Sequence, residues 1–432
     1  MIDLDRLCRA EWGHLLSSLI RSFGDFDLAE EALQEAFAAA VVEWAEQPPN
    51  NPRAWLYGTA RHRAIDRIRH RTRSQALLAE LAPFDERHLQ STDPADDAVP
   101  DERLRLMFTC CHPALAPEAR VALTLRTLGG LSTDEIAHAF LVPSVTMAQR
   151  LVRAKGKIRE ANIPYSIPEA EDLPERLAAV MAVLYLIFNE GYAAASGDTL
   201  LRRDLSSEAI ELTRLLRALL AQRMPQVPAE VDSLLALMLL HDARRDTRVG
   251  PDEELVLLEA QDRTRWDQAQ IREGCGLVNG ALRRDRPGTY ALEAAIAAVH
   301  AESKRAEDTD WPQIAALYER LRALHPSPVV ALNHAVAVAM SEGPAAGMPL
   351  IDALEESLSG YYLWHAARAD LWRRLDRREE AIESYRRAHE LTQNASELRF
   401  LARRIREMGE MGSPLSSAPP RSSPSDSRRP RS

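Results

Sequence analysis

The stretch Leu131–Ile158 reads LSTDEIAHAFLVPSVTMAQRLVRAKGKI, and its pattern decides the fold of the chain around it. Ser132 is followed three residues later by Glu135, the pattern of a capping box at the start of a helix. Pro143 cannot continue a helical hydrogen-bond ladder, so the first helix must end before it. Ser144 then offers a cap for a second helix. Two short helices joined by a tight turn predict a helix-turn-helix.

The second helix of this motif is expected to have one apolar face and one polar, basic face. The inward residues are expected to be Val145, Met147, Leu151 and Ala154. The outward residues are expected to be Thr146, Ala148, Gln149, Arg150 and Arg153, followed by Lys155, Lys157 and Arg159. Gln and Arg side chains can bind base edges and phosphates. The pattern therefore favours a DNA-reading helix over its alternative, a helical hairpin inside an all-α domain.

A second informative stretch is Asn51–Arg73, which reads NPRAWLYGTARHRAIDRIRHRTR. Pro52 suits the first turn of a helix, and Asn51 before it can serve as the cap. The stretch holds seven arginines and one acid, whereas a solvated helix face usually mixes the two signs. Arginines neutralise phosphates, and aromatic rings stack on unpaired bases. We therefore expect contact with melted nucleic acid, and leave open that Trp55 and Tyr57 are core residues instead.

The rest of the chain has helical periodicity too, without sustained period-two alternation, so the predicted fold class is all-α. Proline-rich and polar stretches mark the boundaries between helical blocks. The predicted division is a helical block at 1–81, an acidic linker at 82–100, a helical block with the helix-turn-helix at 101–162, a linker at 163–173, a large helical region at 174–411, and a disordered tail at 412–432.

The chain has 432 residues and a formal net charge of −10, an unusual sign for a nucleic-acid binder. This sum hides a segregation, because Arg53–Arg73 alone carries seven arginines against one acid. The longest apolar run, Leu177–Phe188, has twelve residues, whereas a membrane span needs about 18. The four cysteines are scattered, and the N-terminus lacks the order of a signal peptide. We therefore expect a cytoplasmic protein that contacts no membrane.

Two clusters raise the questions of metal binding and catalysis. Cys110, Cys111 and His112 are adjacent, but neighbouring cysteines rarely share one tetrahedral ion, so we expect buried thiols and no metal. His241 and Asp242 would be a base and its partner in an enzyme. Neither GxxxxGK[ST] nor HExxH occurs in the sequence, and helix-to-helix ion pairs explain such residues as well. We expect no catalytic residue, no cofactor and no enzymatic activity.

The C-terminal region contains a repeat. Ala366–Leu391 matches one tetratricopeptide unit with a turn near Asp376, and a weaker copy begins near Val330. Setting Gly343 against Asp376 gives a period of 33, close to the repeat's 34. Stacked helix pairs form a concave surface for a peptide or another protein. A protein or peptide ligand of this region is therefore predicted, and a plain helical appendage is the alternative.

The two helical blocks together resemble regions 2 and 4 of a bacterial RNA polymerase sigma factor of the extracytoplasmic-function group. The resemblance covers about residues 5–162 and rests on two independent motifs in the same order and spacing. The stretches that carry it are DLAEEALQEAF (27–37), NPRAWLYGTARHRAIDRIRHR (51–71) and LAPEARVALTLRTLGGLSTDEIAHAFLVPSVTMAQRLVRAKGKI (115–158). The remainder resembles the long helical, tetratricopeptide-like C-terminal extension of one subgroup of these factors.

The resemblance implies three roles and two partners, core RNA polymerase and promoter DNA. The helix with Asp27, Glu31, Gln34 and Glu35 would dock on the polymerase. The residues near the melted minus-10 strand would be Trp55, Tyr57, Arg61, His62, Arg63 and Arg67. The residues in the major groove at the minus-35 element would be Ser144, Thr146, Ala148, Gln149, Arg150 and Arg153.

Two of these positions depart from the family pattern. His62 occupies a place where some members have an amide, and Ala148 one where a longer polar side chain is common. Direct readout at the minus-35 element would then depend more on Gln149 and Arg150. The C-terminal extension would regulate the factor. An alternative remains a helix-turn-helix regulator with a tetratricopeptide-like sensor domain that does not join the polymerase, although the acidic helix at 27–37 argues against it.

Overall fold

The computed structural model describes residues 4–45, 49–76, 99–140, 142–192, 196–197, 203–284 and 286–410. Over these residues the chain is almost wholly helical, which confirms the predicted all-α class. The strands of this part are two residues long each, β1 (Ser196–Gly197) and β2 (Gln393–Asn394), and they pair in parallel. None of the described helices is long and apolar enough to cross a membrane.

The N-terminal two fifths of the chain form seven helices within the described ranges. Three belong to the first predicted block: α1 (Leu4–Phe23), α2 (Phe26–Glu43) and α3 (Pro52–Ala76). Four belong to the second: α4 (Val99–Cys110), α5 (Pro117–Thr127), α6 (Thr133–Ala139) and α7 (Ser144–Glu160). We refer to these blocks as the N-terminal block and the helix-turn-helix block.

The rest of the described chain, which we call the extension, begins at α8. Its first helices are α8 (Leu173–Tyr192), α9 (Arg203–Arg223), α10 (Ala229–Asp242), α11 (Gln268–Arg284), α12 (Thr289–Glu302) and α13 (Trp311–Leu324). Its last helices are α14 (Pro328–Glu342), α15 (Pro344–Asp352), α16 (Glu355–Leu358), α17 (Tyr362–Arg374), α18 (Arg378–Leu391) and α19 (Ala395–Glu410). Short 3-10 helices are η2 (Arg245–Thr247), η3 (Leu258–Ala260), η4 (Arg263–Arg265) and η5 (Ala306–Asp308).

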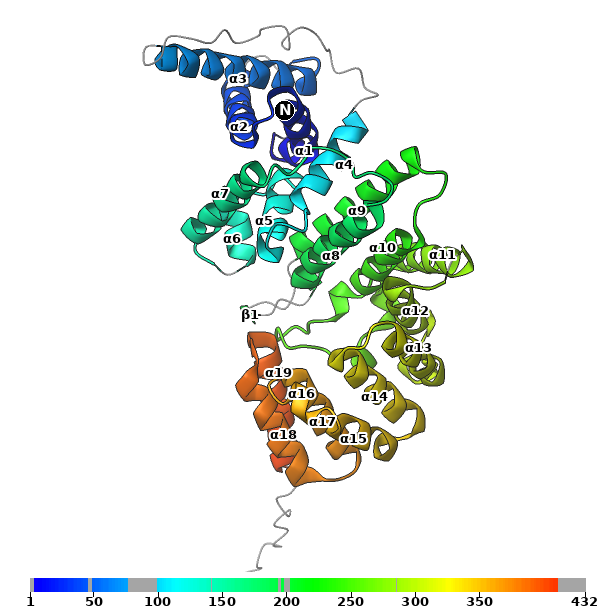
Figure 1. The fold of residues 1–432 in the computed structure, drawn as a ribbon. Helices are drawn as coiled ribbons and strands as arrows, with labels where there is room; N and C mark the ends of the chain where they lie inside the picture. Colours follow the sequence, from blue (N-terminus) through cyan, green and yellow to red (C-terminus); the bar gives the residue numbers. More distant parts are fainter. Residues whose placement is uncertain are drawn as a thin grey trace, which may run out of the picture.

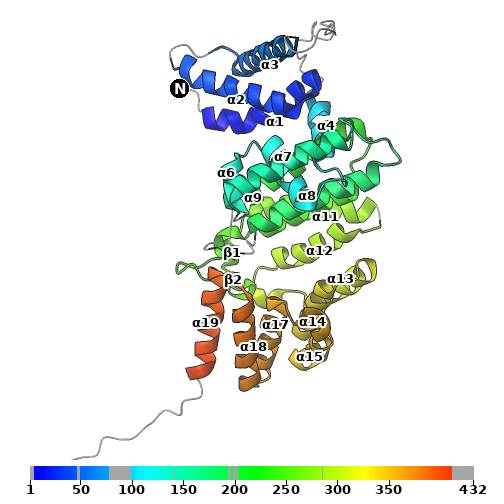
Figure 2. The same cartoon turned by 60° about the vertical axis from the view of Figure 1, so that its left-hand side comes forward.

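The helices stack into an elongated body that follows the order of the chain. The N-terminal block lies at one end, the helix-turn-helix block and α8–α10 lie in the middle, and α14–α19 lie at the other end (Figures 1 and 2). The contacts between α8 or α9 and α4, and between α8 and α5, join the extension to the helix-turn-helix block. The extension is therefore built directly onto this block.

One continuous hydrophobic core crosses the boundaries between the predicted blocks. It contains buried side chains from α1–α3, α4–α7 and α8–α10, such as Leu16, Leu33, Phe108 and Leu184. The stretch predicted as a second linker, 163–173, is held against this core, because the Tyr165 hydroxyl donates to the backbone carbonyls of Ser17 and Glu102, both at 3.1 Å. The N-terminal block and the helix-turn-helix block thus pack on each other.

Two glycines allow α1 to approach the turn between α5 and α6. A Cβ atom on Gly13 would lie 2.9 Å from the backbone carbonyl oxygen of Leu128. Gly130 has a φ of +69°, and a Cβ atom on it would lie 3.1 Å from the Cβ of Trp12. Only glycine tolerates both the close backbone contact and the left-handed conformation without strain. This contact joins the N-terminal block to the helix-turn-helix block.

The terminal helices of the extension form antiparallel pairs, as the repeat predicted. Gly343 separates α14 from α15 with a φ of +101°, and Asp376 separates α17 from α18 with a φ of +57°. Both are the positions that the repeat aligned as turns.

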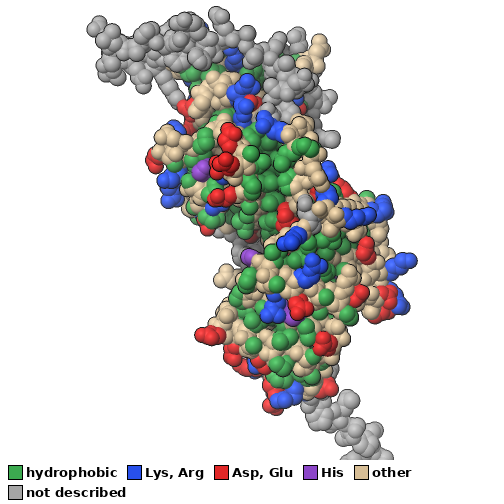
Figure 3. Space-filling model, turned by 45° about the vertical axis from the view of Figure 1, so that its right-hand side comes forward, with side chains coloured by type: hydrophobic (Ala, Val, Ile, Leu, Met, Phe, Trp, Pro, Cys, Tyr) green, Lys and Arg blue, Asp and Glu red, His purple; other side chains and the backbone are tan. Residues whose placement is uncertain are grey.

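Acidic and basic side chains are interspersed over the lower body on the face that Figure 3 shows. Residues 82–98 of the linker predicted at 82–100 and the tail predicted at 412–432 lie outside the described residues, whereas Val99 and Pro100 begin helix α4 instead of ending the linker.

Candidate nucleic-acid interface

The helix-turn-helix forms where the capping box predicted it. The backbone N–H of Ser132 donates to the Glu135 carboxylate at 2.7 Å, and the N–H of Glu135 donates to the Ser132 hydroxyl at 3.1 Å. One detail of the prediction is wrong. Ser144 is the first residue of α7, Pro143 is the N-cap, and no side chain caps this end. Ser144 is exposed at the tip of the helix instead.

The outward face of α7 carries most of the predicted minus-35 residues. Thr146, Ala148, Gln149 and Arg153 are exposed, and Arg150 is half-buried. The Arg153 Nε donates to the backbone carbonyl of Gln149 at 3.3 Å, within the same helix. The core-facing side consists of Met147, Leu151, Ala154 and Ile158. The face thus presents short polar and basic side chains to solvent.

Val145 was predicted to point inward, and this was wrong. It is 69% exposed, and Val152, about two turns further on, is 65% exposed. Positions 145, 148, 149 and 152 follow the spacing of a single helical face, so the period that placed Gln149 outward should also have placed Val145 there. Exposed apolar groups on a recognition helix suit contact with a thymine methyl.

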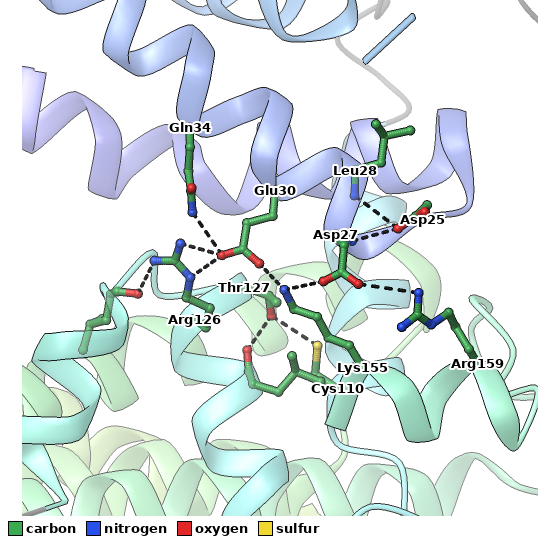
Figure 4. A network of polar contacts seen from close by, with 12 residues as sticks. Asp25, Asp27, Leu28, Glu30, Gln34, Cys110, Arg126, Thr127, Lys155 and Arg159 are labelled. Carbon is green, nitrogen blue, oxygen red and sulfur yellow. Dashed lines mark hydrogen bonds and ion pairs between the residues drawn. The ribbon is translucent and has the colours of Figure 1, made fainter. Parts of the chain in front are cut away.

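Two basic residues at the C-terminal end of α7 were also predicted to face outward, yet they bind α2. The Lys155 ammonium lies 3.0 Å from Asp27 and 2.5 Å from Glu30, and Arg159 lies 3.6 Å from Asp27 (Figure 4). Burial lowers the pKa of Lys155, but the charges of and hydrogen bonds to Glu30 and Asp27 outweigh burial and raise it overall. Lys155 therefore stays charged in this contact.

Glu30 lies at the centre of this network, and the sequence did not single it out. Its carboxylate also binds Arg126 of α5 at 2.5 Å, and both side chains are only 10% exposed. Arg126 in turn donates to the Leu131 carbonyl at 2.9 Å and lies 5.1 Å from the centre of the Trp12 ring. An acid mid-helix in an amphipathic pattern is usually solvated, so only its partners on α5 and α7 reveal this role.

The basic helix α3 starts as predicted, with the Asn51 side chain accepting from the N–H of Ala54 at 3.0 Å. Trp55 is half-buried and packs edge-to-face on Trp44, with ring centres 5.3 Å apart. Tyr57 is half-buried as well, and its hydroxyl lies 3.4 Å from the Ser22 hydroxyl. Both rings therefore contribute to packing between helices, which agrees with the alternative that Trp55 and Tyr57 are packing residues.

The basic side chains of α3 divide into two groups. His62 and Arg63 are exposed, while Arg61 is half-buried and has contacts of its own. Arg67 is paired with both Glu31 and Glu35 of α2. The predicted minus-10 residue Arg67 and two of the predicted polymerase-binding acids thus hold α2 and α3 together.

The remaining predicted polymerase-binding residues also have partners within the chain. Gln34 is exposed and donates to the Glu30 carboxylate at 3.3 Å. Asp27 binds Lys155 and Arg159, as described above. The polar side chains of α2 therefore divide between α3 on one side and the helix-turn-helix block on the other.

The cysteine pair is buried, as expected. Cys110 Sγ lies 3.2 Å from the Thr127 hydroxyl, and Cys111 Sγ lies 3.4 Å from that of Thr124. Burial raises the pKa of Cys110 strongly and that of Cys111 to about 11. His112 is turned to the backbone, where its Nδ1 accepts from the N–H of Ala114. No group of three metal-ligating side chains occurs among the described residues.

His241 and Asp242 point in different directions and do not form a base and its partner. Asp242 binds Arg245 at 2.6 Å and accepts from Gln270 at 3.0 Å. His241 lies instead in the wall of a cavity, where its Nδ1 contacts the Arg244 guanidinium at 3.0 Å. Asp242 is thus occupied by structural contacts, which removes the pairing that an enzyme would need.

A helix-turn-helix with an exposed polar face, joined to a paired acidic and basic helix, defines a DNA-binding transcription protein. Two family models match these parts: sigma-70 region 2 over residues 10–74, and sigma-70, region 4, over residues 105–158. A third model, described as a family of unknown function, matches residues 176–282. The chain belongs to the extracytoplasmic-function group of the sigma-70 family and carries a C-terminal extension.

Several proteins are similar to this chain. An uncharacterized protein of Rhizobium meliloti is 44% identical over 390 residues, which are 89% of this chain and 91% of that protein. The ECF RNA polymerase sigma factor SigW of Bacillus subtilis is 30% identical over 32% of this chain and 78% of its own length. The probable ECF RNA polymerase sigma factor SigI of Mycobacterium tuberculosis is 27% identical over 38% of this chain and 57% of its own length. No solved structure matches the chain.

Proposed function

We propose that this sigma factor joins core RNA polymerase in the cytoplasm, recognises minus-10 and minus-35 promoter elements, and initiates transcription there. The observation that carries the proposal is the exposed outward face of α7, with Thr146, Ala148 and Gln149 in solvent, inside the part that matches sigma-70 region 4. The N-terminal end of α7 has no side-chain cap, so the backbone N–H groups of its first turn suit a DNA phosphate. The division into region 2 at 1–81, region 4 at 101–162 and the extension at 174–411 is part of this proposal.

Run-off transcription with core polymerase tests the whole proposal. The templates carry the promoters found by mapping transcription start sites after overexpression of the protein. We expect initiation at those promoters only when the protein is added. If the protein binds these promoters but never directs initiation by core polymerase, it is a helix-turn-helix regulator that does not join the polymerase.

Arg150→Ala tests the reading of the minus-35 element. Arg150 is the half-buried base-reading candidate on α7, and an Arg bound to a base edge supplies about 1–3 kcal/mol of discrimination. The variant should lose this amount at one base position and little at the others. Arg153→Ala is the matched control, since an exposed phosphate contact weakens all sequences alike. A uniform loss for Arg150→Ala would contradict its assignment.

Docking on the polymerase requires α2 to exchange partners, because Asp27, Glu31, Gln34 and Glu35 all contact other residues of this chain. We propose that the polymerase supplies basic side chains that replace Lys155, Arg159 and Arg67, which separates α2 from the C-terminal end of α7. Arg67 is thereby released toward the minus-10 strand beside Arg61, His62 and Arg63. Distance measurements between spin labels on exposed positions of α3 and α11 should lengthen when core polymerase is added.

The extension is proposed to regulate the factor through its contact with the helix-turn-helix block. Arg176 of α8 donates to the backbone carbonyl of Phe108 near the end of α4, at 2.7 Å. Deleting the whole extension would expose the shared core, so a point variant is the better test. Arg176→Ala should change promoter output, whereas Arg272→Ala, an exposed arginine on α11, should not. Equal output from both variants and the wild type would contradict regulation through this contact.

The helix pairs of α14–α18 are proposed to bind a protein or peptide ligand, as the tetratricopeptide-like repeat suggests. The surface proposed for this ligand differs from the cavity among α10, α12 and α13, which has the size of a small molecule.

A further inference from the structure

The extension contains a cavity of about 340 Å³ that the proposed function does not use. Its walls come from α8, α10, α12, α13 and α14 and from the segment around η3 and η4, and apolar side chains such as Leu237, Leu240 and Ile296 cover much of them. Pockets for small organic ligands are concave and mostly apolar, with a few convergent polar groups, and their volumes begin at about 300 Å³. This cavity fits the lower end of that class.

The polar groups of the cavity gather at two ends. Glu293, Ile296, Ala297 and His300 line it from one face of α12, in the i, i+3, i+4, i+7 order of a helix. Glu293 and His300 are therefore about 10 Å apart along the helix axis, at 1.5 Å per residue. Glu293 accepts from the Tyr185 hydroxyl at one end, at 3.4 Å. The other end holds His300 with His241, which lies at the end of α10, and Arg244, which follows that helix.

The basic end has unused hydrogen-bond donors. Arg244 contacts the ring nitrogen of His241, and none of the described carboxylates pairs with its guanidinium. Burial and the nearby arginines lower the pKa of His300 to about 4 and hold that of His241 well below its ordinary value. Both imidazoles are therefore neutral, and the Nδ1 of His300 is buried without a partner. One arginine with neutral donors beside it is a site for an anion.

We propose that this cavity binds a small organic carboxylate, with the carboxylate at Arg244 and His300, an apolar body along α12, and a hydroxyl group at Glu293. The positive charge of the Arg244 guanidinium excludes a cationic ligand at the basic end. A hydrated inorganic anion makes no favourable contact with the apolar walls in the middle of the cavity. The site goes beyond the proposed function and does not depend on it.

The cavity is placed where a ligand could influence the rest of the chain. The two sides of α10 belong to different cores: Leu234 and Met238 pack in the core shared with the helix-turn-helix block, while Leu237 and Leu240 pack beside the cavity. A ligand that orders the cavity walls would therefore stabilise the helix that joins both cores.

Calorimetric titration of the full chain tests the site, with para-hydroxyphenylacetate and its homologue with one more methylene as probes. We expect saturable binding of at least one acid at one site per chain. Arg244→Gln should weaken this binding about tenfold or more, because it removes a charge-assisted hydrogen bond. Arg320→Gln on α13, an exposed arginine outside the cavity, is the matched control and should bind like the wild type.

Two further arms keep the test decisive. The neutral amide of the same acid should bind about tenfold more weakly, since it lacks the charge that Arg244 pairs. Asn333→Trp places a bulky ring at the exposed rim of the cavity and should block entry of the acid. This variant tests the site independently of Arg244→Gln, whose effect could come from a change in the fold. The proposal is overturned if neither acid binds, if the amide binds as tightly as the acid, or if Asn333→Trp leaves binding unchanged.

Discussion

At the residue scale, the structure separates charges that are bound within the chain from charges that are free for partners. Glu30 is nearly buried and binds Arg126 and Lys155, whereas Glu31 at the next position is about half exposed and binds Arg67. Adjacent acids on one helix thus have different energetic roles, because burial decides what the loss of a counter-charge costs.

Glu30→Gln should destabilise the protein strongly. Removing one member of a buried ion pair leaves an uncompensated charge, which costs about 3–5 kcal/mol, and Lys155 retains Asp27, so the lower end is expected. Glu31→Gln is the matched control and should cost below about 1 kcal/mol, as exposed pairs do. Calorimetric unfolding combined with hydrogen exchange of α2 and α7 measures both. Equal effects of the two variants would contradict the central role of Glu30.

Glu293 should make the stability of the extension depend on pH. Burial in the cavity wall raises its pKa from 4.5 to about 7, the hydrogen bond from Tyr185 lowers it, and the charge of Glu230 adds to the rise. Since the folded pKa is the higher one, the folded state favours the protonated acid. Stability from this group is complete below pH 4.5 and is lost as pH rises to about 7.

Glu293→Gln removes the cost of ionising a buried acid, so the variant should be more stable than the wild type at pH 8. The expected gain in the free energy of unfolding is up to about 3 kcal/mol, because one pKa unit corresponds to about 1.4 kcal/mol. The advantage should vanish near pH 4.5. Thermal unfolding at several pH values measures it, with Glu319→Gln, an exposed acid on α13, as the variant that should show no such trend. An advantage for Glu293→Gln that is equal at every pH would contradict the buried-acid explanation.

At the element scale, contacts between helices that are distant in the sequence decide what each helix presents. The N-terminal half of α7 has an exposed outward face, while its C-terminal half is bound to α2 through Lys155 and Arg159. Helix α3 is likewise divided, with Arg67 bound to α2 while His62 and Arg63 are exposed. A basic residue on a predicted DNA-binding helix is therefore either exposed, and available for the proposed DNA contact, or a link between helices.

Gly13→Ala should loosen the contact between α1 and the turn that follows α5. The new Cβ would lie 2.9 Å from the Leu128 carbonyl oxygen, so the backbone must move, and overpacking of this kind costs about 1–3 kcal/mol. Gly58→Ala in α3 is the matched control. Its Cβ would meet no atom within 4 Å, and it should stabilise the helix by up to about 1 kcal/mol.

Thermal unfolding and small-angle scattering measure these changes. The expected result is a lower unfolding temperature and a larger radius of gyration for Gly13→Ala alone. A variant that keeps the stability and compactness of the wild type would show that the two blocks do not depend on this close contact.

At the scale of the whole molecule, the net charge of −10 is distributed over mixed surfaces. Within the described residues, Arg67 of α3 is paired with two acids of α2, and Lys155 and Arg159 of α7 are bound to Asp27. Cations that are already paired within the chain displace fewer counterions from DNA.

The free protein should bind promoter duplex weakly, with a Kd in the range of about 10⁻⁴–10⁻⁶ M typical of non-specific binding, and with a small salt slope. Fluorescence anisotropy at several salt concentrations measures both quantities. Arg63→Ala should reduce the slope by about 1 if Arg63 contacts a phosphate. Nanomolar binding of the free protein at physiological salt would contradict the expectation.

The local parts of the fold could be predicted from sequence because their signals are local. The Ser132–Glu135 capping box, the Asn51 cap and the turns at Gly343 and Asp376 each depend on residues within a few positions of one another. The family resemblance also followed from the order and spacing of short motifs. The prediction for Val145 failed because the helical period was misapplied, since the spacing that places Gln149 outward places Val145 there too. The prediction for Lys155 failed because its partners, Asp27 and Glu30, lie on a helix far away in the sequence.

The sequence by itself determined an all-α protein of the sigma-70 family, since helix periodicity, caps and motif spacing are properties of short segments. Only the tertiary structure decided that the two sigma blocks and α8–α10 share one core, that Glu30 joins α5 and α7, and that Arg244, His300 and Glu293 line one cavity. Glu30 lies 96 positions from Arg126 and 125 from Lys155, and Arg244 lies 49 positions from Glu293 and 56 from His300. Such contacts depend on how whole helices pack, because no short segment carries information about a partner so far along the chain.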